Sequence, residues 1–148
     1  MMTETQKEKL VSLARELVGK PYQYGAKPED APNVFDCSSF TQYLFGKIGI
    51  ELPRSSILQA GDQKGRGVEP KPDFSNLEPG DLLFSRGAVG HYRDELFGGE
   101  PVDIGHVTIY LGTGRIVHAR EKLGGVKEQP IAELHAEPKY QIVLVKRF

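Results

Sequence analysis

The sequence predicts an α+β protein, with helices in its first half and an antiparallel β-sheet in its second half. Helical spacing of apolar residues is confined to the first 60 residues, whereas short apolar runs bounded by Gly and Pro fill the stretch from residue 81 onward. Because helices and strands are segregated, parallel βαβ units are not expected. A chain of 148 residues suits one core, so we expect a single domain over residues 1–148.

The N-terminal segment carries the signature of a capped helix. Thr3 and Gln6 stand at the spacing of a capping box, and the apolar stripe that follows predicts a helix over residues 1–18 that Gly19 ends. Residues 20–35 contain three prolines and are therefore expected to form a loop that leads to the second helix.

A second helix is expected to begin at Cys37. Apolar residues follow this cysteine at helical spacing until Gly46, and Ser55 or Ser56 then offers an N-cap for a short helix through Ala60. Beyond it, glycine and proline punctuate the chain into six further segments. They predict an irregular stretch over 61–79, a strand over 81–85, an exposed excursion over 86–104, a hairpin over 106–118, a loop over 121–138 and a last strand over 140–146.

Charge and hydropathy exclude several classes of partner. Nineteen basic residues balance twenty acidic ones, and no Lys/Arg run is present, so a nucleic acid or an anionic membrane has no electrostatic support as a partner. No apolar segment has the length of a signal peptide core or a membrane span. We expect a monomer that needs no cofactor, and the compartment stays open.

The only cysteine, Cys37, is a candidate nucleophile. A single cysteine excludes an internal disulfide and a CxxC zinc site. The first N–H groups of a helix lack partners and carry the positive end of its dipole, so we expect the pKa of this thiol to lie below its ordinary value. Since a lone cysteine is more often a small buried apolar residue, the inference depends on finding a base.

Two histidines on one predicted hairpin supply that base. Side chains alternate faces along a strand, so the turn decides whether His106 and His118 share a face. A two-residue turn would leave them on opposite faces. A three-residue loop over residues 112–114 pairs Leu111 with Arg115 and places both histidines on one face as diagonal neighbours, about 7–8 Å apart at the backbone. We expect the second arrangement.

The three side chains together predict thiol chemistry. His106 would act as general base toward Cys37, and His118 would fix its tautomer and ring plane. A Cys/His/His zinc site with a bound water uses the same residues and stays open as an alternative. The other two histidines, His91 and His135, lie in polar loop sequence and are expected to be exposed.

Five motifs in order give the sequence a family resemblance. They are GKPYQYG at 19–25, FDCS at 35–38, LPRS at 52–55 with Gln59, LEPGDLLF at 77–84, and GHVTIYLG at 105–112 with VHA at 117–119. This set resembles the NlpC/p60 family of bacterial cell-wall endopeptidases over about residues 19–120. The resemblance implies a papain-like domain whose N-terminal helices pack on an antiparallel sheet.

The resemblance also implies a reaction. Members hydrolyse amide bonds in peptidoglycan stem peptides, typically between D-isoglutamyl and a diamino acid, through a thioester acyl-enzyme. Cys37 matches the nucleophile, His106 the base and His118 the residue that orients the base. Tyr22 matches a tyrosine whose hydroxyl points toward the nucleophile and helps to hold the oxyanion. The implied partner is a peptidoglycan peptide, which implies action outside the cell or in its envelope.

Residues beside the nucleophile match substrate contacts of the family. Asp36 and Ser38 are expected to contact substrate, with Asp36 receiving a free amino terminus, and Arg54 is grouped with them. The alternatives are that Asp36 caps the helix and that Arg54 pairs with a surface carboxylate. Family members usually have Gly where this chain has Ser39, and their link into the base-bearing strand is shorter than residues 86–104.

Two other functions remain open at this stage. A papain-like amidase, deamidase or acyltransferase on a non-wall substrate would use the same three groups. A catalytically silent binding module is disfavoured by the complete set of Cys37, His106 and His118.

Overall fold

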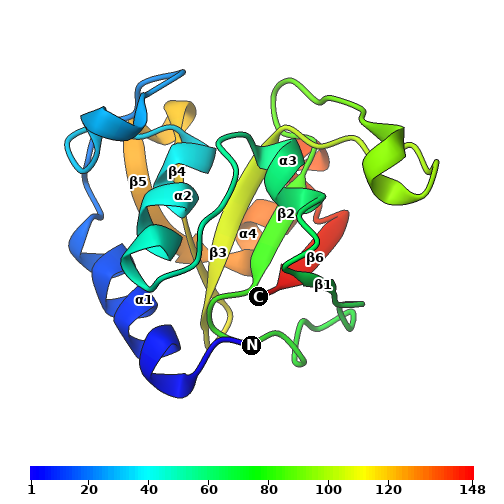
Figure 1. Cartoon of the computed structure of the whole chain (residues 1–148), viewed down its shortest axis with the longest axis horizontal. Coiled ribbons are helices and arrows are strands. Elements are labelled where there is room, and N and C mark those ends of the chain that lie inside the picture. The colour runs from blue at the N-terminus through cyan, green and yellow to red at the C-terminus, as the bar shows by residue number, and fades with distance from the viewer.

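Helices cover both faces of one antiparallel sheet in the computed structural model, which describes residues 1–148 (Figure 1). The helices are α1 Glu4–Glu16, α2 Cys37–Lys47, α3 Ser56–Ala60 and α4 Ile131–His135. The strands are β1 Arg66–Gly67, β2 Leu82–Ser85, β3 His106–Gly112, β4 Arg115–Arg120, β5 Gly125–Pro130 and β6 Leu144–Arg147. Short 3-10 turns occupy Pro28–Asp30, Asp94–Phe97, Glu121–Leu123 and Pro138–Tyr140. The predicted α+β class is confirmed.

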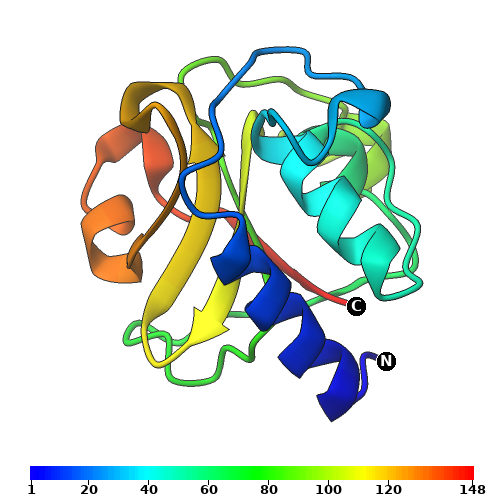
Figure 2. The ribbon, with the colours of Figure 1, turned by 90° about the vertical axis from the view of Figure 1, so that its left-hand side faces the viewer.

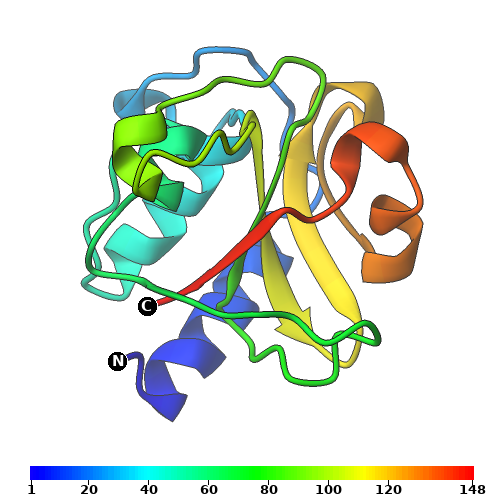
Figure 3. The ribbon, with the colours of Figure 1, turned by 90° about the vertical axis from the view of Figure 1, so that its right-hand side faces the viewer.

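The sheet order is β1-β6-β2-β3-β4-β5, and every neighbouring pair is antiparallel. The central strands β2 and β3 are buried on both faces, which explains why they read as nearly continuous apolar runs. Figure 2 shows α1 and α2 on one side of the sheet and the segment that holds α4 on the other. Figure 3 shows the chain end after β6 lying near the N-terminus, and Met2 N donates to Phe148 O at 3.0 Å.

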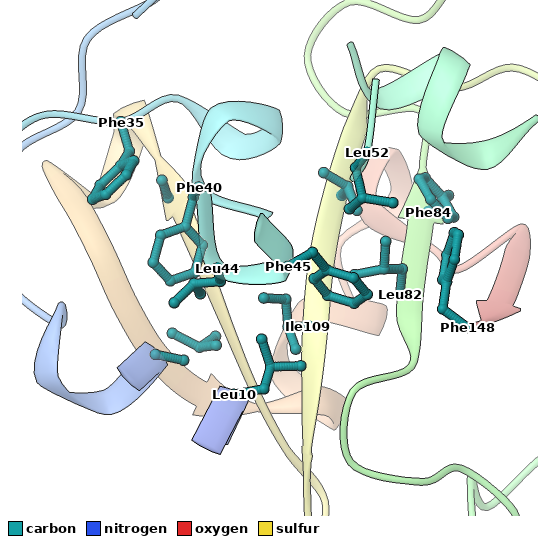
Figure 4. Packing of buried hydrophobic residues seen from close by; sticks show 14 of the residues in the cluster. Leu10, Phe35, Phe40, Leu44, Phe45, Leu52, Leu82, Phe84, Ile109 and Phe148 are labelled. Atoms are coloured by element: carbon teal, nitrogen blue, oxygen red, sulfur yellow. The ribbon is translucent and has the colours of Figure 1, made fainter. Parts of the chain in front are cut away.

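The larger core lies between the sheet and the helices α1 and α2 (Figure 4). Phe40 and Leu44 of α2 and Leu10 of α1 are fully buried against Ile109 of β3. The ring of Phe35 meets that of Phe40 edge to face at a centroid distance of 5.3 Å. Each buried side chain of this size contributes about 1.5–3 kcal/mol. This packing fixes the start of α2 against the start of β3.

The predicted caps of the first and third helices are confirmed, although α1 begins at Glu4 rather than at residue 1. At α1, Gln6 N donates to Thr3 Oγ1 at 3.1 Å and Thr3 N donates to Gln6 Oε1 at 2.8 Å. The helix ends at Glu16, two residues earlier than predicted. At α3, Ser55 is the N-cap and the helix ends at Ala60 as expected.

The start of α2 lies at Cys37, as predicted, because Asp36 caps the helix. Asp36 Oδ1 accepts from Ser39 N at 2.9 Å, while Ser39 Oγ accepts from Asp36 N at 2.9 Å. Ser39, which replaces the usual glycine of the resemblance, is therefore the reciprocal partner in a capping box. The nucleophile candidate thus occupies the first helical position.

The prediction of a loop over residues 121–138 is wrong. This stretch contains β5, which pairs with β4 along its whole length, and the short helix α4. The residues of β5, GVKEQP, contain a single large apolar side chain, Val126, so no alternation marks the strand. It exists because β4 supplies hydrogen bonds to it. With five residues, α4 is too short to show helical periodicity.

Two other boundaries differ from the sequence-based expectation. The last strand was expected over 140–146 but β6 spans Leu144–Arg147, since residues 138–140 form a 3-10 turn. The irregular stretch 61–79 contains only the two residues of β1 as regular strand structure.

The excursion over residues 86–104 projects between β2 and β3, at the upper right of Figure 1. Two of its large side chains, Val89 and Tyr92, are exposed, as expected for such a segment. Its base is closed by hydrogen bonds in both directions between His91 and Ile104, each 3.0 Å long. A Cβ on Gly105 would lie 1.9 Å from the carbonyl oxygen of Val89, so only glycine fits where the two ends of the excursion meet.

None of the four α-helices combines the length and the apolar character needed to span a lipid bilayer.

Candidate active site

The β3–β4 hairpin places both histidines on one face, as predicted. Ile109 pairs with Val117, so His118 lies opposite Thr108 one step further along the strands. His106, two residues before Thr108, is then the diagonal neighbour of His118. The predicted face relation between the histidines is confirmed.

The turn that produces this register differs from the prediction. Gly112 pairs with Arg115, so the turn has two residues, Thr113 and Gly114, with φ values of +50° and +74°. A two-residue turn alone would put the histidines on opposite faces. The register shifts by one between Tyr110 and Gly112, a bulge at Leu111 that restores the shared face, and the predicted pairing of Leu111 with Arg115 is wrong.

The two imidazoles are joined directly. His106 Nε2 and His118 Nδ1 are 2.8 Å apart, and the rings meet edge to face at an interplanar angle of 74°. His118 is fully buried and His106 is 6% exposed, so no solvent competes for this contact. One ring is therefore fixed by the other, as the sequence argument required.

A residue that the sequence analysis missed holds the far side of His118. His118 Nε2 lies 2.7 Å from Gln129 Oε1, and Gln129 Nε2 donates to Glu133 Oε2 at 3.4 Å. Gln129 belongs to β5, where it is the diagonal neighbour of His118 across the β4–β5 pair. It lies in the stretch that was expected to be a loop, and only the strand pairing could have revealed it.

Both imidazoles are neutral at pH 7. Burial, the neighbouring His118 and the charge of Arg120 hold the pKa of His106 well below its usual range. Burial also lowers the pKa of His118 to about 4, although the hydrogen bond that Gln129 Oε1 accepts from this ring acts in the opposite direction. A neutral imidazole has one nitrogen with a free lone pair, which is what a general base requires.

An ion pair with a buried arginine and a partly exposed carboxylate lies beside the histidines. Arg120 donates to Glu137 through two bonds of 2.7 and 2.9 Å, and its guanidinium carbon lies 3.8 Å above the ring of Tyr140. The ring of Tyr140 in turn meets that of His106 edge to face at 5.1 Å. The sequence analysis did not identify these residues, because Glu137 and Tyr140 come from the C-terminal segment.

The thiol of Cys37 lies against the backbone around His106. Its Sγ–H donates to the carbonyl oxygen of Gly105 at 4.0 Å, and the backbone N–H of Val107 acts to lower the thiol pKa. These two residues flank the base candidate in sequence, so α2 delivers the sulfur to the start of β3. Cys37 is partly exposed, which leaves the sulfur open to a substrate.

The expectation of a thiol pKa below its ordinary value is wrong for the free protein. Burial, followed by the charge of Asp36, raises the pKa of Cys37 to about 11. The N–H groups of Val107 and Ser38 and the charge of Arg54 act in the opposite direction but are weaker. The helix N-terminus therefore does not ionise this thiol, because burial and then the charge of the preceding carboxylate outweigh it.

The three predicted substrate-contact residues form one cluster next to Cys37. Arg54 Nη2 lies 2.7 Å from Asp36 Oδ2, and Arg54 Nη1 donates to Ser38 Oγ at 2.8 Å. Asp36 Oδ2 also accepts from Gly25 N at 3.1 Å. Arg54 thus pairs with the carboxylate before the nucleophile rather than with a surface carboxylate, and Asp36 both caps α2 and holds Arg54.

The tyrosine of the resemblance also lies near the thiol. Burial, followed by the negative charge of an ionised Cys37, raises the pKa of Tyr22, so its hydroxyl stays protonated and can donate a hydrogen bond. Its backbone forms a parallel bridge with Phe35 two residues before Cys37. Tyr24, in contrast, is 86% exposed and does not pack.

The two remaining histidines differ from each other. His91 is exposed, as expected. The prediction for His135 is wrong, because this side chain is half-buried, accepts from Ile142 N at 3.2 Å through Nδ1, and packs against the ring of Phe74 at 5.1 Å. Its role is structural.

The zinc alternative has no geometric support. The structure brings together no group of three or more His, Cys, Asp or Glu side chains arranged to hold a metal ion. His106 Nε2 and His118 Nδ1 are committed to each other, and His118 Nε2 to Gln129. Three of the four ring nitrogens therefore have partners inside the protein.

Comparison with known proteins identifies relatives of this site and fold. The chain is 36% identical over 121 residues to the gamma-DL-glutamyl hydrolase of Bacillus subtilis, covering 82% of this chain and 25% of that protein. It is 35% identical over 118 residues to the probable endopeptidase p60 of Listeria innocua, covering 80% of this chain and 20% of that protein. The chain thus spans a quarter or less of the length of these relatives.

Solved structures show the same fold. The peptidoglycan hydrolase RipB of Mycobacterium tuberculosis matches with a TM-score of 0.65 and 28% identity, over 97% of this chain and 64% of that chain. NlpC2 of Trichomonas vaginalis matches with a TM-score of 0.75 and 22% identity, over 100% of this chain and 49% of that chain. The model of the NlpC/P60 family matches residues 19–145, which contain every side chain of the cluster described above. The chain belongs to the NlpC/P60 family.

Proposed function

We propose that this protein is a cysteine endopeptidase that hydrolyses amide bonds in peptidoglycan stem peptides, between a D-γ-glutamyl residue and a diamino acid. The observation that carries the proposal is the hydrogen-bonded pair His106–His118 beside a thiol at the first position of α2. The substrate class is supported by the names of the relatives, gamma-DL-glutamyl hydrolase and peptidoglycan hydrolase.

The reaction begins from a neutral thiol and a neutral imidazole. As Cys37 Sγ attacks the carbonyl carbon of the scissile amide, the thiol proton passes to the free Nδ1 of His106. The imidazolium that forms keeps its Nε2–H bond to His118, whose neutral Nδ1 accepts it. The imidazolium is stabilised only while this attack proceeds. In the transition state the pKa of the Cys37 thiol therefore falls and that of the His106 ring rises, so the two values approach each other.

Collapse of the tetrahedral intermediate completes the first half of the reaction. The C–N bond breaks, the leaving amine of the diamino acid takes the proton from His106, and a thioester with Cys37 remains. Water then attacks the thioester with His106 again as base, which releases the glutamyl carboxylate and restores the thiol. The protonated hydroxyl of Tyr22 is the donor that we assign to the developing oxyanion.

We assign recognition of the peptide to the cluster of Asp36, Ser38 and Arg54. Asp36 is 7% exposed and sits next to the nucleophile, so it can receive the free amino terminus of a stem peptide. Both of its oxygens already accept internal hydrogen bonds. A bound ammonium group would therefore share the carboxylate with Arg54, which favours short peptides whose terminus reaches this point.

Digestion of peptidoglycan of known chemistry, analysed by mass spectrometry, tests the proposal. Wild-type protein should release fragments cut after the D-γ-glutamyl residue, and Cys37→Ala and His106→Ala should release none. His91→Ala is the matched control, because His91 is exposed and outside the cluster, and it should retain full activity. Hydrolysis by Cys37→Ala would refute the proposal.

A second candidate is an amidase, deamidase or acyltransferase that uses the same thiol on a non-wall substrate. The observation in its favour is the excursion over residues 86–104, whose base packs on Gly105 beside the nucleophile and which carries the exposed side chains Val89 and Tyr92. A panel of acyl donors assayed beside the peptidoglycan digest separates the two functions. Turnover of a donor without release of wall peptides would favour the second.

A further inference from the structure

We infer that Gln129 is a positioning residue that selects the tautomer in which His106 can act as a base. The inference rests on the function proposed above and extends it to a residue outside the three candidate catalytic groups. It stands on a chain of hydrogen bonds that runs from the surface of α4 to the candidate base: Glu133, Gln129, His118 and His106.

Glu133, on the side away from His118, fixes the orientation of the Gln129 side-chain amide. The carboxylate of Glu133 can only accept hydrogen bonds, so the group of Gln129 that faces it is the NH2 donor. The carbonyl oxygen of Gln129 then faces His118, at 2.7 Å from Nε2. Because this oxygen can only accept, the proton of the neutral His118 ring must lie on Nε2.

The tautomer of His118 determines the tautomer of His106. With its proton on Nε2, His118 presents a lone pair at Nδ1, which accepts from His106 Nε2–H across 2.8 Å. Burial keeps the pKa of each ring below its usual range, so neither ring carries a second proton. His106 Nδ1 is left with its lone pair and can take the proton of Cys37.

The reverse orientation would disable the base. If the NH2 group of Gln129 faced His118, that ring would carry its proton on Nδ1 and donate it to His106. His106 would then carry its own proton on Nδ1 and present a donor rather than a lone pair to the thiol. Since His118 is fully buried, water cannot supply the missing acceptor. The carbonyl of Gln129 therefore decides which tautomer is present.

Two substitutions of similar volume separate this role from simple packing. Gln129→Glu keeps an acceptor toward His118, whereas Gln129→Met removes it. We expect Gln129→Met to lower kcat about tenfold to hundredfold on a stem-peptide substrate with KM nearly unchanged, because only part of the molecules retain the correct tautomer. Gln129→Glu should keep kcat within about threefold. Gln63→Met, at an exposed glutamine, is the matched control and should behave as wild type.

Nitrogen-15 NMR of the histidine rings reads the tautomer directly. In the Cys37→Ala background both rings should show the Nε2–H pattern, and adding Gln129→Met should give a mixture for His118. Because this readout needs no turnover, failure of the proposed reaction and failure of the positioning role are distinguishable. Glu133→Ala, an exposed change that leaves the sheet intact, should give the same mixture in weaker form.

Three results would overturn the inference. The first is an unchanged nitrogen pattern in Gln129→Met, and the second is a changed pattern with full kcat. The third is an equal loss of kcat in Gln129→Glu and Gln129→Met, because the presence of an acceptor would then have no effect.

Discussion

The candidate nucleophile and the candidate base lie in two regions that each contain a partly buried Arg–carboxylate pair. The charge that acts more strongly on the titrating group is negative in the first region and positive in the second. Beside the thiol, the charge of Asp36 raises the pKa of Cys37 more than its partner Arg54 lowers it. Beside the imidazoles, the guanidinium of Arg120 lowers the pKa values and Glu137 is its partner.

The opposite charges in the two regions have the same effect on protonation. A negative charge next to Cys37 disfavours the thiolate, and a positive charge next to the histidines disfavours the imidazolium. Both regions therefore favour the neutral form of the pair, in addition to burial. In the proposed reaction, the thiolate–imidazolium ion pair would therefore form as the thiol attacks and would not exist before substrate binds.

The largest expected effect concerns the neutral His118. Its pKa is about 4 in the folded protein, and about 6.5 is expected unfolded, so the unfolded chain binds a proton first as pH falls. The contribution of neutral His118 to the free energy of unfolding is fully present above pH 6.5. It is lost as pH falls toward 4, which lowers the free energy of unfolding by about 3 kcal/mol. Urea unfolding of wild type and His118→Gln at both pH values measures it. An equal pH dependence of the two proteins would contradict the comparison.

The next effect concerns the ion pair beside the thiol. Arg54→Met leaves the carboxylate of Asp36 without its cationic partner, and Arg54 is about one-third exposed at its side chain. We expect a loss of about 2–3 kcal/mol in the free energy of unfolding, below the range for fully buried pairs. Urea denaturation measures the loss. Arg93→Met removes an exposed pair with Glu95 and should change stability by less than about 0.5 kcal/mol.

A smaller effect tests the charge of Asp36 on the thiol. Asp36→Asn keeps a side-chain acceptor for the cap of α2 but removes the negative charge that raises the pKa of Cys37. Alkylation by iodoacetamide at pH 8 should become about tenfold faster, which corresponds to one pKa unit. In wild type the rate should still rise between pH 9 and 11. A wild-type rate that levels off below pH 8 would show that the thiol is already ionised.

Several features of the fold were predictable because local rules determine them. The caps at Thr3 and Ser55 follow from side chains that reach backbone N–H groups three residues away. Cys37 begins a helix because Asp36 can cap it, and His106 and His118 share a face because strands alternate. The hairpin turn was predicted wrongly, since a bulge at Leu111 gives the same face relation as a longer loop.

Taken by itself, the sequence determined which side chains are candidates for the chemistry, through motifs that lie within a few residues of each helix or strand start. Only the tertiary structure decided their environment. Gln129 reaches His118 because β5 pairs with β4, and Arg120 lies beside the histidines where Tyr140 of the last 3-10 turn packs on it. The thiol pKa depends on burial and on Asp36 together, and their balance follows from packing rather than from helix position.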